Sequence, residues 1–176
     1  MPSPRDTQHT VPDPRQAKPR RKDPHMRLVI QRVQSASVSV DGSVRGAIER
    51  GLMVLAGFVD GDTEQVLDWA AEKVVELRIF PDAAGKMNLS VRDAGGGVLL
   101  VPNFTLAGDA SKGRRPGFDR ALKPELASPL FDALCDRVAA RGVDVQRGVF
   151  RAHMHAALVN DGPVTLVVDS PSPLRS

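Results

Sequence analysis

The chain has 176 residues, of which 41% are hydrophobic, and a formal net charge of +3. This length and composition indicate one globular domain with a sizeable core, and no long apolar run or signal-peptide pattern is visible, so we expect no membrane partner and a cytoplasmic location. The single cysteine, Cys135, excludes an intrachain disulfide and suits a reducing compartment.

Residues 1–25 differ in composition from the rest of the chain. They hold six prolines and six Lys or Arg residues against three Asp residues, so they carry the whole net charge, and the other residues balance eighteen basic with eighteen acidic side chains. Such a segment cannot bury enough apolar surface to fold. We therefore expect a disordered Pro-rich basic extension over 1–25, a domain over 26–170 and a frayed end over 171–176. The extension could contact RNA, could be merely solvated, or could precede a true start at Met26.

The first part of the domain has the pattern of β-strands. Apolar residues alternate over residues 28–40, Asp41-Gly42 marks a tight hairpin, and residues 44–48 form the returning strand. The continuous apolar run over residues 52–59 predicts a buried central strand, because it is short and bounded by glycines. Connections of hairpin length indicate that the strands pair in an antiparallel manner.

Two helices are expected from apolar periodicity and capping residues. The first begins with Asp62 as its N-cap, and its apolar stripe must cover a sheet. The second begins with Ser128 as N-cap and Pro129 at the first helical position, and Gly142 ends it. Its inner face includes Cys135, which we interpret as a core residue and not as a nucleophile. These elements predict an α+β fold, a compact single domain of largely antiparallel sheet covered by two main helices.

Between the helices, the apolar residues 98–101 predict a buried strand. Proline cannot donate to a strand ladder, so Pro102 must lie at an edge, a bulge or a strand end. The segment Gly108–Phe118 that follows is a polar, glycine-bearing loop, which could meet phosphates or could simply be solvated. Its basic residues are Lys112, Arg114 and Arg115.

Near the C-terminus, two β-type runs meet at Gly162-Pro163. The peptide bond before a proline is the only kind that is readily cis, and glycine tolerates backbone angles that are closed to other residues. From these residues alone, the pair is either a plain turn or a rigid corner. The plain turn is favoured because most X-Pro bonds in folded proteins are trans.

The sequence lacks the conventional catalytic motifs. It has no G-x-S-x-G elbow, no H-E-x-x-H pair, no cysteine cluster and no P-loop. His153 and His155 are two residues apart, which would put both on one side of a strand as two zinc ligands might be, but no third ligand is indicated near them. Thr105 could be a nucleophile only if a base activated it, and none is indicated. A metal-dependent esterase that uses the histidine pair is therefore one alternative.

Five motifs lie in the chain in the same order as in one known family: Met26–Val33, Phe80–Leu89, Asn103–Leu106, Phe150–Met154 and Asn160–Thr165. With these motifs the chain resembles the D-aminoacyl-tRNA deacylases over residues 26–169. In that family, homodimers of compact domains hydrolyse the ester of D-amino acids mistakenly joined to tRNA and reject L-amino acids. The resemblance implies a hydrolase that acts in chiral proofreading.

The resemblance also implies a role for each matched residue. Gly162 and Pro163 would form a cis peptide that enters the partner subunit's pocket and excludes L-amino acids. Phe104 and Thr105 would form the floor of the ester site, where backbone amides face the oxyanion while water attacks with help from the neighbouring ribose hydroxyl. No cofactor, metal or covalent intermediate is implied, and the partner is the acceptor end of tRNA, with no DNA expected. The remaining substrate-binding residues would be Pro102, Asn103, Phe150, Met154 and Asn160, with Phe150 and Met154 near the terminal adenosine.

Selection by exclusion further implies that glycyl-tRNA is cleaved, because glycine has no side chain to reject. Two positions depart from the pattern of the family. Ser-Gln is usual where Pro102 and Asn103 stand, and a related deacylase group with a proline there has looser chiral rejection. An acidic residue is common where His153 stands. A non-catalytic, dimeric module that binds RNA or protein is the second alternative.

Overall fold

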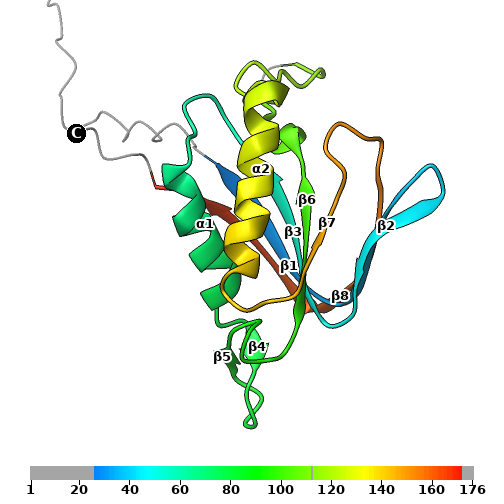
Figure 1. The fold of residues 1–176 in the computed structure, drawn as a ribbon, viewed down its shortest axis with the longest axis vertical. Helices are drawn as coiled ribbons and strands as arrows, with labels where there is room; N and C mark the ends of the chain where they lie inside the picture. Colours follow the sequence, from blue (N-terminus) through cyan, green and yellow to red (C-terminus); the bar gives the residue numbers. More distant parts are fainter. Residues whose placement is uncertain (1–25, 112, 172–176) are drawn as a thin grey trace, which may run out of the picture.

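The computed structural model describes residues 26–111 and 113–171. The predicted extension over 1–25, Lys112 and residues 172–176 of the predicted frayed end lie outside the described residues. Within the described part, two α-helices, α1 (Gln65–Glu76) and α2 (Pro124–Ala139), lie beside a curved sheet (Figure 1). Neither helix is long and apolar enough to cross a membrane.

The strands and the short 3-10 helix of the described residues are β1 (Arg27–Val40), β2 (Ser43–Ile48), β3 (Gly51–Gly57), β4 (Phe80–Pro81), β5 (Met87–Leu89), β6 (Gly97–Pro102), η2 (Phe104–Ala107), β7 (Val145–Arg147) and β8 (His155–Asp169). The main sheet has the order β2-β1-β3-β6-β7, and β8 also pairs with β1. β4 and β5 form a separate two-stranded sheet that projects at one end of the molecule (Figure 1). The sheet and helices thus form a single α+β domain.

The expected antiparallel pairing holds for only part of the main sheet. β1 is antiparallel to β2, β3 and β8, but β3 pairs with β6 and β6 pairs with β7 in parallel. Parallel neighbours need a crossover connection. Here α1 and the β4–β5 hairpin connect β3 to β6, and α2 connects β6 to β7. The sheet is therefore mixed, because both helices belong to crossovers.

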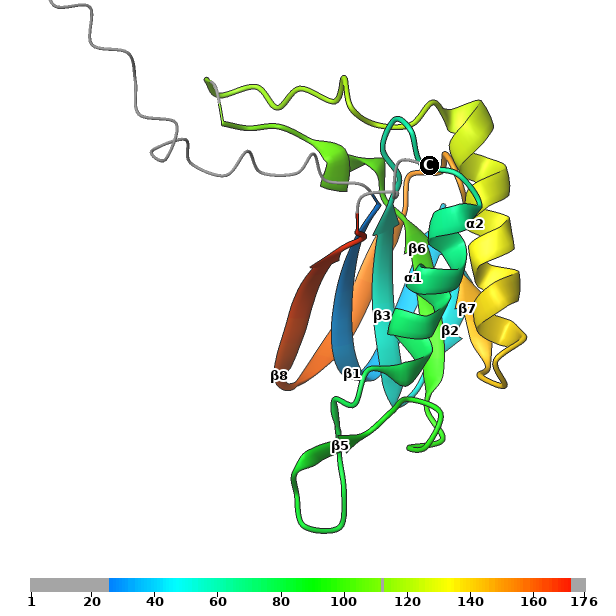
Figure 2. The same ribbon diagram turned by 90° about the vertical axis from the view of Figure 1, so that its left-hand side faces the viewer.

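Both helices lie on the same side of the main sheet (Figure 2). Leu52 of β3 shares one buried cluster with Leu67 of α1 and Cys135 of α2, whereas the adjacent Met53 belongs to a second buried cluster. Successive residues of a strand point to opposite faces, so the two clusters lie on opposite faces of the curved sheet. Cys135 is a core residue as predicted, and burial raises the pKa of its thiol to about 12.

The start of α1 differs from the prediction. Glu64 occupies the N-cap position and makes no side-chain capping hydrogen bond. Asp62 lies two residues earlier, where its carboxylate accepts hydrogen bonds from the backbone amides of Met26 (3.1 Å) and Val59 (2.8 Å). Its acceptors therefore join the start of β1 to the turn after β3, in place of the helix amides.

The predicted start of α2, with Pro129 at the first helical position, was wrong. The helix begins at Pro124, which occupies the first helical position, and Pro129 lies inside it together with Ser128. A proline at the first position lacks only an amide that would have no partner in the helix. Two prolines five residues apart therefore gave the sequence two possible starts. The predicted end is close, because α2 stops at Ala139 and Gly142 follows with a φ of +81°.

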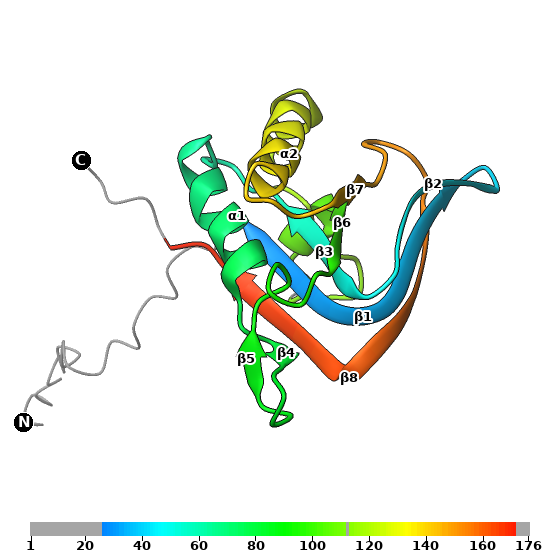
Figure 3. The same cartoon turned by 60° about the horizontal axis from the view of Figure 1, so that its bottom comes forward.

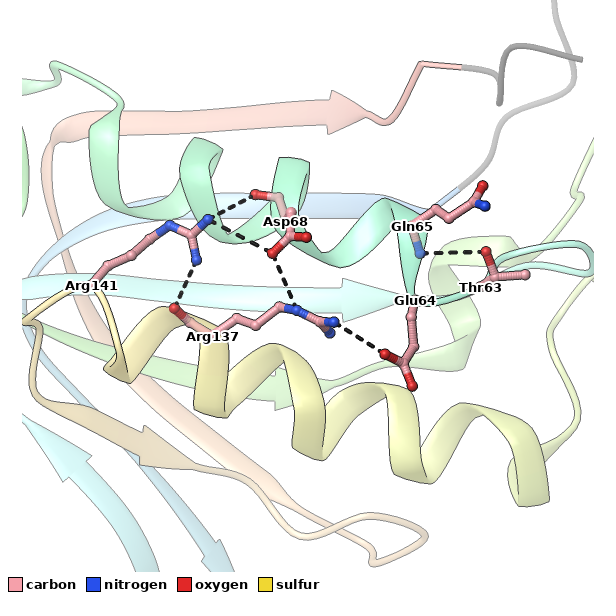
Figure 4. A network of polar contacts seen from close by, with 6 residues as sticks. All are labelled: Thr63, Glu64, Gln65, Asp68, Arg137 and Arg141. Atoms are coloured by element: carbon pink, nitrogen blue, oxygen red, sulfur yellow. Dashed lines mark hydrogen bonds and ion pairs between the residues drawn. The ribbon is translucent and has the colours of Figure 1, made fainter. Parts of the chain in front are cut away.

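A polar cluster joins the two helices at their surface (Figure 4). The guanidinium of Arg137 lies 3.1 Å from a carboxylate oxygen of Glu64 and 3.2 Å from one of Asp68. Arg141 donates hydrogen bonds to the carbonyl oxygens of Arg137 (2.9 Å) and Asp68 (3.4 Å). Exposed ion pairs of this kind contribute little each, so the cluster adds to the apolar packing between α1 and α2 without replacing it.

β8 is one continuous strand, whereas two runs joined at Gly162-Pro163 were expected. The strand pairs with β1 on both sides of this dipeptide, and the two strands bend together (Figure 3). The register shifts in between, so residues 161–164 lie opposite Arg32 alone and form a bulge in β8. The dipeptide is a corner within a strand and not a plain turn. The register pairs on either side are Thr165 with Gln31 and Asn160 with Val33.

Candidate active site

The segment Pro102–Phe104 connects β6 to η2 and is fixed on the end of β3. Pro102 is the last residue of β6, a position that suits proline because it has no amide hydrogen to donate to a neighbouring strand. The amide of Asn103 donates to the carbonyl oxygen of Ala56 (2.8 Å). Gly57 permits this contact, because a Cβ atom there would lie 2.9 Å from the Asn103 carbonyl oxygen. The segment therefore sits closer to β3 than a residue with a side chain at position 57 would allow.

The side chain of Asn103 caps η2. Its Oδ1 atom accepts hydrogen bonds from the amide (3.1 Å) and the hydroxyl (2.5 Å) of Thr105. An amide oxygen is not a base that could activate the hydroxyl, so Thr105 lacks the partner that a nucleophile needs. The amide of Phe104, in contrast, donates to no acceptor within the described part of the chain. It is the free backbone donor of this segment.

Two cavities flank the segment, and Pro102, Asn103 and Phe104 line both of them. The first, which we call the helix-side pocket, has a volume of about 530 Å³ and reaches Ala56 of β3 and the start of α2. The second, the sheet-side pocket, has a volume of about 570 Å³ and reaches Leu55 on the opposite face of β3. The segment is therefore a ridge between two pockets.

The two residues expected near the adenosine lie in different pockets. Phe150 lines the helix-side pocket and packs against Phe131 of α2, with ring centroids 6.4 Å apart. Met154 lines the sheet-side pocket, and its sulfur accepts a hydrogen bond from the amide of Val149 (3.2 Å). The structure thus gathers five of the predicted site residues around one ridge. They are Pro102, Asn103, Phe104, Phe150 and Met154.

The predicted site residues on β8 line neither of the two pockets. Gly162 and Pro163 are exposed, the peptide bond between them is cis, and Gly162 has a φ of +109°. The Nδ2 atom of Asn160 lies 3.4 Å from the Thr165 hydroxyl, and its buried Oδ1 atom has no partner among the described residues. The structure therefore does not bring this group to the ridge within one chain.

Arg32 lies beneath the Gly162 bulge and was not among the predicted site residues. Its Nη1 atom donates to the carbonyl oxygen of Ile79 (2.5 Å), and its Nε atom lies 2.9 Å from a carboxylate oxygen of Asp161, an ion pair whose angles do not make a hydrogen bond. A Cβ atom at Gly162 would lie only 2.5 Å from Nη2. The buried guanidinium therefore supports the bulge and leaves no room for a side chain on it.

Phe118 is a second residue that the sequence reasoning missed. It lines the helix-side pocket and packs edge-on against Phe104, with ring centroids 5.3 Å apart. Signals for both residues were present in the sequence. Arg32 is a charged residue two positions after Ile30 on the inward face of β1, and Phe118 is an aromatic residue in an otherwise polar loop.

The histidine pair is exposed and does not complete a metal site. The rings of His153 and His155 contact each other with centroids 5.0 Å apart, and His153 lines the sheet-side pocket. Over the described ranges, no group of three or more His, Cys, Asp or Glu residues could hold a metal ion. Catalytic zinc sites have three protein ligands, so this pair lacks the usual donor set.

The similarity of this chain to known proteins extends over nearly the whole domain. Residues 29–169 match the family model described as D-Tyr-tRNA(Tyr) deacylase. The D-aminoacyl-tRNA deacylase of Geotalea uraniireducens is 53% identical over 146 residues, which cover 83% of this chain and 94% of that protein. The enzyme of the same name from Anaeromyxobacter dehalogenans is 54% identical over 145 residues, which cover 82% of this chain and 97% of that protein.

Solved structures show the same fold. The protein named c-Myc DNA Unwinding Element Binding Protein superposes with a TM-score of 0.78 at 35% identity, over 83% of this chain and 99% of its own. A probable eukaryotic D-amino acid tRNA deacylase has a TM-score of 0.72 at 22% identity, over 82% of this chain and 98% of its own, a likeness of fold alone. The family model matches this chain from β1 to the end of β8. The chain therefore belongs to the D-Tyr-tRNA(Tyr) deacylase family.

Proposed function

We propose that this protein hydrolyses the ester bond of D-aminoacyl-tRNA to release free tRNA and the D-amino acid, a chiral proofreading step of translation. The family match over residues 29–169 carries this proposal, because it includes every residue that lines the two pockets. Relatives named for this activity are 53% and 54% identical to the chain. We assign the reaction to the ridge Pro102–Phe104, where a substrate could reach both pockets.

In the proposed reaction, a water molecule attacks the ester carbonyl carbon beside Phe104. The bond between that carbon and the ribose oxygen breaks, and the ribose oxygen takes up the proton that the water loses, with help from the neighbouring ribose hydroxyl. We assign stabilisation of the oxyanion to the amide of Phe104, since it has no acceptor within the described residues, whereas Asn103 already holds the amide of Thr105. A fixed donor of this kind lowers such a barrier by about 3 kcal/mol.

We assign the rejection of L-amino acids to Gly162 and Pro163 of the partner subunit in a homodimer. Both residues are exposed, line neither pocket of their own protomer, and lie on β8, which among the described strands pairs only with β1. The same strand exposes 52% of Val159 and 63% of Val167, an apolar surface that a second protomer would cover. A rigid corner from the partner would occupy the volume that an L-side chain needs.

Rejection by occupied volume has a consequence for the smallest substrate. Glycine has no side chain that the corner could exclude, so we infer that glycyl-tRNA, including tRNA-Ala mischarged with glycine, is also cleaved. The remaining substrate contacts are assigned to residues on the ridge, in the two pockets and on β8. They are Pro102, Asn103, Phe150, Met154 and Asn160.

The proposed catalytic unit is the domain over 26–170, acting without a cofactor or metal in the cytoplasm on the acceptor end of tRNA. A second candidate is a non-catalytic binding module, and one structural neighbour is named for binding a DNA element. Outside residues 1–25, however, basic and acidic residues balance at eighteen each. Binding along an extended duplex requires a surplus of cations over a whole surface, so the charge of the domain favours local contact at one end of a nucleic acid.

Deacylation of D-tyrosyl-, L-tyrosyl- and glycyl-tRNA by the purified protein, measured side by side, tests the proposed function. We expect cleavage of the D-tyrosyl and glycyl esters, with L-tyrosyl-tRNA left intact. A protein that leaves all three esters intact is a binding module and not this enzyme. A parallel reaction with EDTA should proceed at the same rate, because loss of activity would favour a metal site at His153 and His155.

Thr105→Val separates hydrolysis by water from attack by a threonine nucleophile. The hydroxyl donates to Asn103 and not to a base, so its removal should leave at least about a tenth of the wild-type kcat. A loss of about 10⁴-fold or more, with the fold intact by circular dichroism, would instead assign the attack to Thr105.

A further inference from the structure

The loop between η2 and α2 carries cations that the proposed reaction does not use. Its base is fixed, because Asp109 and Gly117 exchange two backbone hydrogen bonds (2.8 and 2.9 Å). The backbones of Arg120 and Leu122 also bond to the segment after β3. Arg114 and Arg115 stand between Asp109 and Gly117 in the chain. The two arginines are therefore presented from an anchored loop.

Three cations between η2 and α2 are exposed: Arg114, Arg115 and Lys123. Within the described ranges, these three residues make no ion pair or side-chain hydrogen bond. Lys123 also lines the helix-side pocket, as does Arg151, which lies 3.8 Å from a carboxylate oxygen of Glu125. This contrasts with Arg27, Arg92, Arg137 and Arg147 elsewhere in the domain, each of which lies within 3.2 Å of a carboxylate.

The helix-side pocket, which Lys123 lines, also has aromatic walls. Phe118 follows Arg115 in the loop and packs on Phe104, and the two rings are 36% and 60% exposed. Exposed aromatic rings bind bases by stacking, and adjacent cations bind the phosphates between them. An acidic peptide would satisfy the cations but would give the exposed rings no comparable partner.

We propose that Arg114, Arg115 and Lys123 form a docking surface for the phosphates of the tRNA acceptor arm, beside the helix-side pocket. This inference rests on the proposed function, since it takes aminoacyl-tRNA as the substrate. It adds the residues that hold the RNA outside the reacting ester. The ridge cleaves the ester, and the loop sets how well a whole tRNA is bound relative to its last nucleotide.

Two substrates that share the same ester separate docking from chemistry. One is D-tyrosyl-tRNA, and the other is the D-tyrosyl ester of adenosine, which has no phosphates. For an Arg114→Ala/Arg115→Ala variant, we expect kcat/KM on the tRNA to fall roughly tenfold through KM, and the slope of log(kcat/KM) against log salt to become shallower by roughly 1.5. Hydrolysis of the adenosine ester should not change. Lys123→Ala should act in the same direction, since the Lys123 side chain makes no cap hydrogen bond to α2.

The matched control is Arg45→Ala/Lys86→Ala, which removes the same charge from exposed residues that line neither pocket. It should leave the kinetics on both substrates unchanged. An unchanged KM for tRNA in the loop variant, or an equal loss on both substrates, overturns the docking surface. If the wild-type protein cleaves neither ester, the proposed function itself fails, so the two failures are distinguishable.

Discussion

Arg32 and Arg137 each join two elements of this domain through ion pairs, but in different surroundings. The side chain of Arg32 is 11% exposed and its partner Asp161 is 33% exposed, whereas Arg137 is 26% exposed and its partners Glu64 and Asp68 are 74% and 71% exposed. A buried charge that loses its partners is costly, while exposed ion pairs contribute little. The contrast indicates that Arg32 fixes the geometry of the Gly162 bulge and that Arg137 only reinforces helix packing.

Gly162→Ala, which changes the bulge that Arg32 supports, should have the largest effect. The new Cβ atom would lie 2.5 Å from the Arg32 guanidinium, at a φ of +109° that L-residues rarely adopt. Either the bulge or Arg32 must move, so we expect the ratio of D- to L-tyrosyl-tRNA cleavage to fall on the order of 100-fold. Parallel deacylation assays on the two substrates measure this ratio.

Gly42→Ala is the matched control for that substitution. Gly42 also has a positive φ, +74°, but a Cβ atom there would meet nothing within 4 Å. It should cost stability of about 1 kcal/mol and leave the D-to-L ratio unchanged. If both glycine variants keep the wild-type ratio, the bulge does not determine handedness.

Arg32→Ala should have the next largest effect and should change two properties together. It leaves the carbonyl oxygen of Ile79 and the carboxylate of Asp161 without their partner, which we expect to cost about 3 kcal/mol of unfolding free energy. The D-to-L ratio should also fall, about tenfold. Arg32→Lys keeps the charge but cannot reach both partners, so it should recover stability more than selectivity. Urea unfolding and paired deacylation assays measure the two, and destabilisation with an intact ratio would limit Arg32 to a structural role.

Arg137→Ala tests the other side of the comparison and should have a small effect. Its partners are exposed, so the loss should be about 1 kcal/mol or less in urea unfolding, with no change in deacylation rate or D-to-L ratio. A loss as large as that of Arg32→Ala would show that exposure does not separate the two arginines.

Asp169→Asn should have the smallest effect, and only above acidic pH. The hydrogen bond from Arg27 lowers the pKa of Asp169, with the charge of Arg27 acting in the same direction. A depressed carboxyl pKa adds stability above the unfolded value of about 3.9, and this stability is lost as the pH falls through the folded pKa. The difference in unfolding free energy between wild type and variant should therefore be present at pH 7 and shrink progressively as the pH falls below about 3.9 and through the folded pKa. A difference that grows on acidification would contradict this sign.

Local patterns predict most elements of this fold but not all of their partners. Alternation located β1 and β2, and the apolar run located β3, because these signals depend on neighbouring residues. The parallel pairing of β3 with β6 was missed, because no local sequence pattern in either strand indicates that α1 belongs to a crossover connection. The start of α2 was misplaced because Pro124 and Pro129 satisfy the same local rule.

The residues of the candidate site were likewise predicted only in part. The resemblance to the family selected Pro102, Asn103 and Phe104, which the structure gathers at one ridge. Residue properties alone gave no role to Arg32, because its contact with the Gly162 bulge joins residues far apart in the sequence through a register shift in β8. That kind of contact depends on tertiary packing, which local propensity does not encode.

The most direct measurement is deacylation by a heterodimer that carries Gly162→Ala in one subunit and Phe104→Pro, which removes the donor amide at the first position of η2, in the other, purified through two different tags. If the corner acts on the partner's ridge, one of the two sites keeps both wild-type residues. We predict about half of the wild-type activity on D-tyrosyl-tRNA and the wild-type D-to-L ratio. A heterodimer with the relaxed ratio of the Gly162→Ala homodimer would contradict a site shared between subunits.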